Sequence, residues 1–364
     1  MPSFELATEG TKITKQGIKE LFMKVYPKFR LLSAVLIAAV SVAMIPSARA
    51  AMDEAALLAA PTPPEIPAGF TEQAQLLLAM AAGKLTLLDI HAPIAIPDSV
   101  EYLEGLTYAK TGDPRQMLDL YVPKGNDKPL PLLIFIHGGG WTGGERTDYK
   151  YYCVRYAQRG YVVASITYRF ADKFPYPACV QDAKCAVRFL RANADKYHID
   201  KARVAAIGGS AGGHLSMMLG YSSGVKALEG DGGYSEQSSA VQVVVDLYGP
   251  TDITLPAARD NSTIKRFFGG KSYDEAPDLY AQASPITHVT KNSPPTLIMQ
   301  GTIDDTVPMT QSDLLYAKLK ELGVPVQYEK FDGYPHTMDI ALEVNVRCQW
   351  FMNHFFDKYL KAQK

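Results

Sequence analysis

The chain has 364 residues, 47% of them hydrophobic and 21% charged, and its formal net charge is −1 at pH 7. These are the proportions of an ordinary globular protein, and they exclude a disordered, collagen-like or coiled-coil chain. The near-neutral balance also argues against a strongly cationic surface for nucleic acid. Four cysteines without C-x-x-C spacing disfavour a disulfide scaffold, a zinc ribbon and a thioredoxin-type site.

The first 50 residues have the pattern of a secretory signal peptide. An uncharged stretch from Leu31 to Ile45 follows a basic segment and leads into an Ala-x-Ala site, which predicts cleavage after Ala50. The stretch is shorter than the ~20 residues of a transmembrane helix, so an uncleaved membrane anchor is the less favoured alternative. The compact basic segment after Met23 indicates that translation starts there. We therefore expect a periplasmic or secreted protein with no stable membrane anchor.

The mature chain begins with a segment of unusual composition. Removal of residues 1–50 takes away seven of the 37 basic and three of the 38 acidic residues, which leaves a net charge of about −5. Residues 51–70 are rich in Ala and Pro, which predicts a mobile leader. Thr71 is the expected N-cap of a short apolar helix, EQAQLLLAMAAG, interpreted as a strut on the domain rather than a lid. Glu104–Tyr108 and Met117–Val122 are predicted strands.

Apolar strands and amphipathic helices alternate along the rest of the chain, a pattern typical of a parallel sheet covered on both faces. The predicted strands are Leu132–Ile136, Tyr161–Ile166, Val204–Ile207, Val241–Leu247 and Thr296–Met299. The predicted helices are Gln181–Ala194, Ala211–Gly220, Gln311–Leu322 and Met338–Leu360. No repeat or change of composition divides this part of the chain, so we expect one catalytic domain over residues 98–364, after an N-terminal leader at 51–97.

The motif HGGGW at residues 137–141 follows the apolar strand PLLIFI. Consecutive glycines allow backbone N–H groups to turn toward the oxyanion that forms in acyl transfer. The amide that follows a nucleophilic serine is the complementary donor. The candidate oxyanion hole therefore consists of Gly139, Gly140 and Ala211, the residue that follows Ser210 in the motif described next.

The motif GGSAG at residues 208–212 follows the strand VAAI and opens a predicted helix. A serine in a sharp strand-to-helix turn needs small neighbours, and Gly208 and Gly212 meet that need. A glycine-rich phosphate-binding loop is the alternative interpretation, but the lysine of such a loop is absent. Ser210 is therefore the candidate nucleophile.

A serine nucleophile needs a histidine base. In hydrolases whose serine lies in a G-x-S-x-G turn between a strand and a helix, this histidine comes last in the chain, after the serine and the acid. Of the seven histidines, only His336 and His354 lie near the C-terminus. His354 lies between aromatic residues on a predicted helix, whereas His336 follows the strand VQYEKF and the turn DGYP, so His336 is the candidate base. The other histidines are His91, His137, His198, His214 and His288. None of the seven has the spacing of a metal site.

The candidate acid lies in the loop GTIDDTVP at residues 301–308, which follows the strand PTLIMQ. A carboxylate there can accept the imidazole N–H and hold the tautomer that the base needs. Asp304 and Asp305 compete for this role. Asp246 and Asp252, which follow an earlier strand, are the fallback acids.

The motifs HGGGW, DAKCAVRFLRANADKYHID, GGSAGGH, YGPTD, GTIDDTVP and GYPH together resemble the α/β-hydrolase esterases of the fold-3 type. This group includes hormone-sensitive-lipase-like enzymes and, as the nearest branch, bifunctional feruloyl and acetyl-xylan esterases. The resemblance covers about residues 98–360 and implies a mostly parallel central sheet with helices on both faces and no large cap domain. It implies Ser210 as nucleophile, Asp304 as acid, His336 as base, and Gly139, Gly140 and Ala211 as oxyanion donors. Gln300 stands where many relatives have His, so packing there is expected to differ.

The resemblance implies a secreted serine esterase that hydrolyses short-chain or carbohydrate-linked acetyl or feruloyl esters through an acyl-enzyme, without metal or cofactor. An amidase of the arylformamidase type and a non-catalytic binding protein on a hydrolase scaffold are the alternatives. The lack of a long N-terminal cap implies an open cleft. Loops such as residues 222–240 and 253–283 are expected to shape the substrate pocket.

The implied fold also predicts which cysteines could form a disulfide. The helix after HGGGW and the last helix share one face of the sheet in this fold, so Cys153 and Cys348 are a candidate disulfide in an oxidising compartment. Cys179 and Cys185, on and around one helix, are expected to be unpaired.

Overall fold

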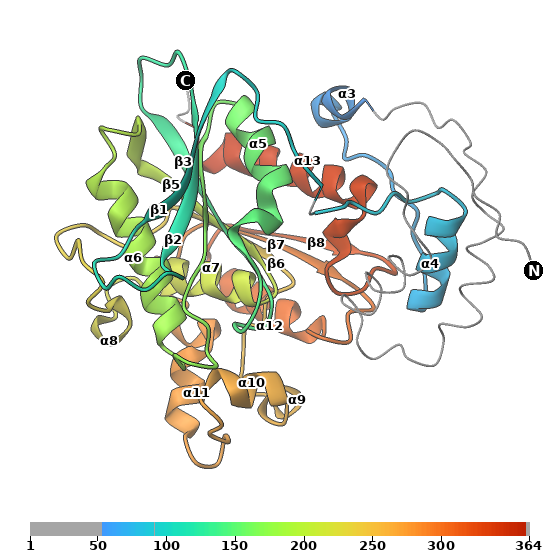
Figure 1. Cartoon of the computed structure of the whole chain (residues 1–364). Coiled ribbons are helices and arrows are strands. Elements are labelled where there is room, and N and C mark those ends of the chain that lie inside the picture. Colours follow the sequence, from blue (N-terminus) through green and yellow to red (C-terminus); the bar gives the residue numbers. More distant parts are fainter. Residues whose placement is uncertain (1–52, 91, 362–364) are drawn as a thin grey trace, which may run out of the picture.

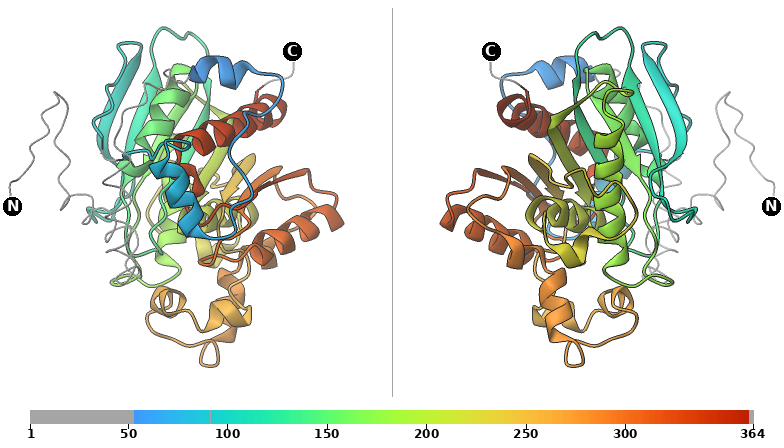
Figure 2. Two further views of the ribbon diagram at one scale, coloured as in Figure 1. Left: turned by 90° about the vertical axis from the view of Figure 1, so that its right-hand side faces the viewer. Right: turned by 90° about the vertical axis from the view of Figure 1, so that its left-hand side faces the viewer.

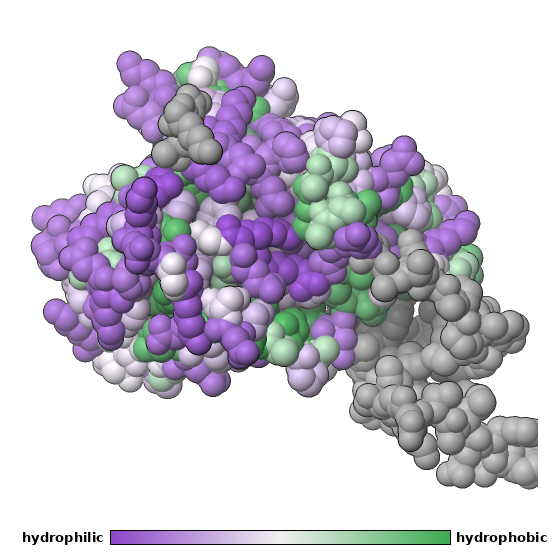
Figure 3. Space-filling view, turned by 90° about the horizontal axis from the view of Figure 1, so that it is seen from above, coloured by the Kyte–Doolittle hydropathy of each residue, from purple (hydrophilic) through white to green (hydrophobic). Residues whose placement is uncertain are grey.

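The computed structural model describes residues 53–90 and 92–361 (Figure 1). The predicted signal peptide at residues 1–50 lies outside these residues, as does His91. Within the described ranges, no helix has the length and apolar content needed to cross a membrane. Seen from above in Figure 3, the surface is mostly hydrophilic, with apolar residues in small groups.

One eight-stranded sheet forms the centre of the molecule, with the strand order β1-β2-β4-β3-β5-β6-β7-β8. The strands are β1 (Val100–Thr107), β2 (Met117–Pro123), β3 (Leu130–Ile136), β4 (Val162–Ile166), β5 (Ile199–Gly209), β6 (Val243–Leu247), β7 (Thr296–Gly301) and β8 (Val326–Phe331). β2 is antiparallel to both β1 and β4, and the remaining pairs are parallel. The predicted parallel sheet is thus confirmed, with one antiparallel edge.

Helices cover both faces of this sheet, as Figures 1 and 2 show. The longer helices are α4 (Gln73–Ala81), α5 (Lys150–Gln158), α6 (Ala178–Ala192), α7 (Ala211–Tyr221), α12 (Thr310–Glu321) and α13 (Leu342–Tyr359). The shorter ones are α3 (Glu54–Ala59), α8 (Lys226–Glu229), α9 (Pro256–Arg259), α10 (Ser262–Phe267), α11 (Pro277–Ala283) and the 3-10 helices η1 (Arg146–Tyr149), η2 (Pro285–His288) and η3 (Met338–Ile340). α5 and α13 pack on one face, whereas α6, α7 and α12 pack on the other.

Strand β3 shows how the sheet separates two cores. Its apolar run LPLLIFI is buried along almost its whole length, and successive side chains point to opposite faces. Leu132 and Ile134 join the core under α6, α7 and α12, whereas Leu133 and Phe135 join the core under α5 and α13. A strand buried on both faces needs a continuous apolar run rather than an alternating one, which is the pattern in the sequence.

Several predicted helix starts differ from the structure; α6, for example, begins at Ala178 rather than at Gln181. The helix after the leader is α4, whose N-cap is Glu72 without a side-chain cap bond, so Thr71 is not the cap. The last helix, α13, begins at Leu342 rather than at Met338, because Met338–Ile340 form the separate turn η3. In each case the apolar pattern marks the helix but not its first turn.

Residues 53–70 are not a mobile leader in the structure, because they lie along α13 (Figure 1). The indole N–H of Trp350 donates to the carbonyl oxygen of Ala60 at 2.9 Å. The hydroxyl of Tyr334 donates to the carbonyl oxygen of Pro67 at 2.7 Å. Ala and Pro side chains form no hydrogen bonds. The composition of this segment therefore could not predict that its backbone carbonyl oxygens accept hydrogen bonds from side chains far away in the sequence.

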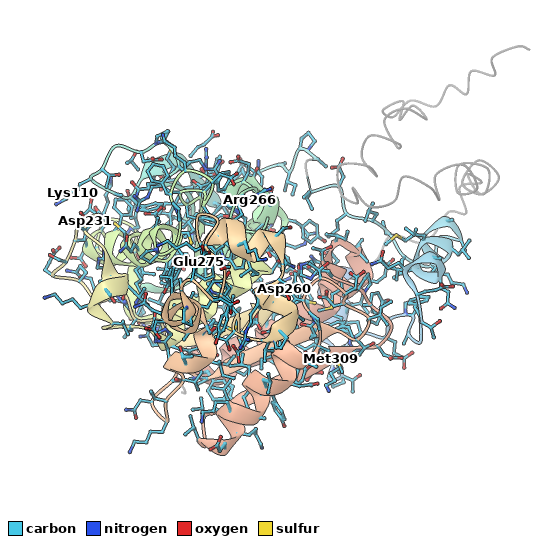
Figure 4. All side chains as sticks on the ribbon, turned by 90° about the horizontal axis from the view of Figure 1, so that it is seen from below. Lys110, Asp231, Asp260, Arg266, Glu275 and Met309 are labelled. Carbon is cyan, nitrogen blue, oxygen red and sulfur yellow. The ribbon has the colours of Figure 1, made fainter. Side chains whose placement is uncertain are left out.

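Helices α9, α10 and α11 form a projection below the sheet in Figure 1, where the sequence predicts only a loop. Figure 4 shows Asp260, Arg266 and Glu275 on this projection, seen from below. The helices have between four and seven residues. Helices this short lack the several turns over which a period of 3.6 residues becomes visible in a sequence.

The predicted disulfide is absent. All four cysteines lie in the described part of the chain, and each is a buried free thiol. Cys153 on α5 and Cys348 on α13 do belong to the same core, as the implied fold requires. Their surroundings differ, however, because Cys153 lies near Asp119 whereas Cys348 lies near Asp339.

Candidate active site

The candidate nucleophile lies in the turn between β5 and α7. Ser210 has φ 58° and ψ −122°, a combination that residues with a side chain rarely adopt. A Cβ atom on Gly208 would overlap the backbone of Gly212, and one on Gly212 would overlap the carbonyl oxygen of Ile136. The close approach of α7 to the ends of β3 and β5 therefore requires both glycines.

The structure brings Ser210, His336 and Asp304 together from three separate loops. His336 Nε2 lies 2.9 Å from the Oγ atom of Ser210, and His336 Nδ1 lies 2.7 Å from Oδ2 of Asp304. Both distances are within hydrogen-bonding range. The Asp304 side chain is fully buried, whereas the His336 side chain is 15% exposed. A ligand in the cavity can therefore reach the imidazole and the hydroxyl, while the carboxylate stays behind them.

The Asp304 carboxylate is held by three donors besides the imidazole. Its Oδ1 atom accepts the amides of Thr306 and Val307, each at 2.9 Å. Its Oδ2 atom accepts Nε2 of Gln300 at 3.0 Å, and Oε1 of Gln300 in turn accepts the hydroxyl of Ser312 at 3.0 Å. Gln300, which stands where many relatives have His, therefore forms a direct hydrogen bond to the candidate acid.

The three candidate oxyanion donors lie around the same serine. Gly139 and Gly140 have φ angles of 92° and 58°, which favour glycine. Among the described residues, the amides of Gly139, Gly140 and Ala211 donate no hydrogen bond. All three residues line a cavity with Ser210. Unused backbone donors beside a serine hydroxyl suit an oxygen that acquires negative charge.

Buried aromatic contacts hold the HGGGW loop. His137 stacks on Tyr168 with ring centroids 4.4 Å apart, and the Tyr168 hydroxyl donates to the carbonyl oxygen of His137 at 3.0 Å. Burial lowers the pKa of His137 to about 4, so this imidazole is neutral at pH 7. His137 therefore supports the loop rather than carrying charge in the cavity.

Trp141 fixes the other end of this loop. Its ring stacks on Phe267 with centroids 4.2 Å apart, and its N–H donates to Nδ1 of His214 at 3.3 Å. Nε2 of His214 lies 2.7 Å from the carbonyl oxygen of Ala283, so it carries the proton. Burial lowers the pKa of His214 to about 4. His214 is thus a neutral link between α7 and the projection formed by α9, α10 and α11.

The alternative acids and the alternative base do not take part in the contacts between the candidate nucleophile, base and acid. Asp305 is exposed, and no hydrogen bond or ion pair joins Asp246, Asp252 or Asp305 to His336 among the described residues. His354 stacks on Trp350, with ring centroids 3.7 Å apart, on the surface of α13. The geometry therefore singles out Asp304 and His336 from the candidates that the sequence leaves open.

A buried cluster beside His336 is absent from the sequence prediction. The carboxylate of Asp339 accepts the hydroxyl of Tyr248 and, at 3.1 Å, the hydroxyl of Tyr152. The Tyr248 ring lies edge-on to His336, with centroids 4.9 Å apart. Burial raises the pKa of Asp339. Tyr248 in the motif YGPTD and the closeness of Asp339 to His336 in sequence were the signals that could have pointed to this cluster.

A cavity of about 660 Å³ opens onto Ser210 and His336. Its size is that of a small-molecule site. The predicted loop at 253–283 contributes to its wall, but no residue of the loop at 222–240 does. The reason is that 222–240 follows the far end of α7, away from Ser210. Leu88 and Ile90, from the N-terminal segment, also line the cavity, which the sequence analysis did not anticipate.

The described residues, 53–90 and 92–361, contain no group of three or more His, Cys, Asp or Glu arranged to hold a metal ion. The groups that meet at Ser210 are its hydroxyl, the imidazole of His336 and the backbone amides of the candidate oxyanion hole, within a cavity that other polar side chains also line. These groups suit acyl transfer at a carbonyl carbon.

Comparisons with known proteins agree with this chemistry. Esterase LipC of Mycobacterium tuberculosis is 34% identical over 63% of this chain and 58% of its own length. A solved structure of a truncated carbohydrate esterase from gut microbiota is 29% identical, covers 72% of this chain and 97% of its own, and superposes with a TM-score of 0.63. Thermogutta terrifontis esterase 2 is 25% identical, covers 75% of this chain and 100% of its own, and gives a TM-score of 0.61.

The curated relatives are longer proteins, since the chain spans just over half the length of LipC and of the second M. tuberculosis relative, LipQ. The BD-FAE family profile, by contrast, matches residues 118–319, more than half of this chain. That match includes HGGGW, GGSAG and the loop of Asp304. The chain therefore belongs to the BD-FAE family and is an α/β-hydrolase of the esterase group.

Proposed function

We propose that this chain is a serine esterase that hydrolyses carboxylic esters with Ser210 as nucleophile, His336 as base and Asp304 as acid. The observation that carries the proposal is the continuous contact from the Ser210 hydroxyl through both nitrogens of His336 to a buried carboxylate. This is the geometry of an activated nucleophile. The esterase relatives support the same class of reaction.

The reaction proceeds in two steps. Ser210 Oγ attacks the ester carbonyl carbon while Nε2 of His336 takes its proton, and the carbonyl oxygen becomes an oxyanion that accepts the amides of Gly139, Gly140 and Ala211. His336 then returns the proton to the leaving alcohol, which leaves an acyl-enzyme. Water, deprotonated by His336, then attacks the acyl carbon, the bond from this carbon to Ser210 Oγ breaks, and His336 returns the proton to Oγ as the carboxylic acid leaves. Asp304 stabilises the imidazolium in both steps.

The proposed substrates are short-chain esters or acetyl and feruloyl groups linked to carbohydrate. The name of the carbohydrate esterase from gut microbiota supports this class, because that structure covers 72% of this chain. A cavity of about 660 Å³ has room for a small acyl group together with part of its alcohol. The proposed partner is a polysaccharide that carries such ester groups. We propose no nucleic-acid partner and no cofactor.

The test is hydrolysis of nitrophenyl acetate by the wild-type protein, by Ser210→Ala and by Ser223→Ala as an exposed serine control. We expect Ser210→Ala to lose at least about 10⁴-fold in kcat, because the nucleophile is gone, and Ser223→Ala to match the wild type. A fluorophosphonate, which loses HF when serine attacks its phosphorus, should add the mass of its phosphonyl group to the wild type and to Ser223→Ala but not to Ser210→Ala. Thermogutta terrifontis esterase 2 has been solved phosphoramylated by tabun, a reagent of related chemistry.

Other outcomes separate the alternatives. Equal rates for Ser210→Ala and the wild type would overturn the assignment of the nucleophile. Cleavage of an aryl formamide but not of acetylated xylan, feruloyl esters or nitrophenyl esters would show an amidase. No turnover and no labelling would favour a binding protein on a hydrolase scaffold.

We also propose that residues 1–50 are removed on export, so that residues 98–364 act as the catalytic domain in the periplasm or outside the cell, behind the segment 51–97. The support is the uncharged stretch followed by the Ala-x-Ala site that ends at Ala50. Mass spectrometry of the exported protein should give a chain that begins at Ala51. A chain that retains Met23 would contradict cleavage.

A further inference from the structure

Residues 83–90, named here the strap, connect α4 to the segment before β1 and lie against the loop that follows His336. The amide of Leu88 donates to the carbonyl oxygen of Ile340 at 2.7 Å, and the amide of Leu342 donates to the carbonyl oxygen of Thr86 at 2.7 Å. These two bonds form an isolated antiparallel bridge between Leu87 and Ala341. The strap is therefore joined by its backbone to the loop that carries His336.

A buried carboxylate adds a second attachment. Glu343, which is 6% exposed, accepts the amide of Thr86 at 2.8 Å and its hydroxyl at 3.1 Å. Hydrogen bonds to a charged group are stronger than those between neutral groups. The strap thus has a defined position over the cavity, fixed at Thr86, two residues before Leu88.

Beyond this attachment the strap forms part of the cavity wall. Leu88 and Ile90 line the same cavity as Ser210 and His336, and Ile340, which the strap binds, lines it too. The three side chains are aliphatic. Aromatic side chains, among them Tyr149, Tyr151 and Tyr152, also line this cavity. Aliphatic and aromatic walls bind apolar groups by removing their surface from water.

We propose that the strap is a specificity-determining wall, in which Leu88 and Ile90 bind an apolar substituent of the ester that is larger than acetyl or methyl. This inference rests on the proposed esterase function. Among the described residues, this short segment from before the proposed catalytic domain then forms one wall of the cavity. The open cleft that the resemblance implies is thereby narrowed on the side of His336.

The experiment measures kcat/KM for two pairs of esters with Leu88→Ala, Ile90→Ala and the wild type. One pair varies the acyl group, nitrophenyl acetate against nitrophenyl hexanoate, and the other varies the alcohol, methyl acetate against benzyl acetate. We expect each variant to lower the large-to-small ratio of kcat/KM in one of the pairs by about tenfold, the discrimination that one or two methylene groups provide in an apolar pocket. Leu78→Ala is the matched control, since Leu78 is 58% exposed on α4 and does not line the cavity.

The results distinguish the specificity proposal from the esterase function on which it rests. A ratio that falls for Leu88→Ala or Ile90→Ala but not for Leu78→Ala supports the proposal. Ratios equal to those of the wild type in both pairs overturn it, while hydrolysis and labelling of Ser210 leave the esterase function standing. Should Leu88→Ala fail to fold, as its melting temperature would show, Ile90→Ala gives the answer by the same criterion. Loss of turnover and of labelling in the wild type itself would refute the esterase function instead.

Discussion

Gly140 shows how little space surrounds the candidate oxyanion hole. Its φ of 58° is in the left-handed region, and a Cβ atom there would lie 2.8 Å from Cγ2 of Thr263 on α10. Thr263 is exposed, so its methyl group can be removed without opening the core. Gly143, in the same loop, has ordinary space, because a Cβ atom there would lie 3.6 Å from the carbonyl oxygen of Gly139.

We expect Gly140→Ala to lower kcat for nitrophenyl acetate about 100-fold, because the displaced loop turns one amide away from the oxyanion. The double variant Gly140→Ala/Thr263→Ser should recover part of this loss, since it removes the methyl group in the way but leaves the strained φ. Gly143→Ala is the control, with activity near that of the wild type. A double variant no better than Gly140→Ala would show that the methyl contact does not matter.

The candidate site residues that the sequence predicts are those with fixed spacing inside a motif. Ser210 lies between two glycines that the turn requires, and His336 follows the last strand. Asp304 needed the family pattern, because nothing local separates it from Asp305. Tyr152 and Leu88 could not be found in this way, since they reach the cavity only through packing between distant parts of the chain.

Among the secondary-structure elements, β6 is unusual because it carries a buried carboxyl group, that of Asp246. Its sequence VVVDL is buried throughout, and the Oδ1 atom of Asp246 accepts the amide of Gly249 at 2.9 Å. The Oδ2 atom has no hydrogen-bond partner among the described residues. Burial raises the pKa of Asp246 to about 8, while the bond from Gly249 acts in the opposite direction. The folded protein therefore favours the neutral acid.

This makes β6 a source of pH-dependent stability. Between about pH 4 and pH 8 the unfolded chain releases the Asp246 proton while the folded chain keeps it, so this residue lowers the free energy of unfolding as pH rises, by up to about 1.4 kcal/mol per pH unit. Asp246→Asn mimics the neutral acid. We expect its stability relative to the wild type, measured by urea unfolding, to increase from pH 5 to pH 8. The exposed Asp305→Asn is the control, and a constant difference for Asp246→Asn would contradict the buried neutral acid.

The elements differ in how well the sequence predicts them. Strands such as β3 and β7 are predicted because burial on both faces demands an uninterrupted apolar run. Helices α9 and α10 are missed because single turns leave no period to detect. Helix α3 is missed because it is short and its tertiary contacts are with α13, far along the chain.

At the scale of the whole molecule, all four thiols are buried. Cys153, Cys179, Cys185 and Cys348 are each at most 1% exposed, and burial raises the pKa of each, to about 11 for Cys185. The thiolate is the reactive form of cysteine. The native protein should therefore carry almost no reactive thiolate at pH 8.

We expect iodoacetamide to leave the native protein unmodified over hours at pH 8 and to modify four thiols once urea has unfolded it. Because the thiols lie in both cores, their labelling should follow the cooperative unfolding of the whole domain. The measurement is intact mass after quenching at increasing urea concentrations. Rapid labelling of one native thiol, or fewer than four after unfolding without reductant, would contradict this arrangement.

The docking of α3 on α13 has a consequence for the order in which the chain completes its fold. The bond from Trp350 to Ala60 joins residues 290 positions apart. Ala60 leaves the ribosome long before α13, so the segment with α3 has no α13 surface to bind until those 290 further residues have been made. The residues next to the proposed cleavage site therefore lack this tertiary partner in a growing chain until α13 has been made.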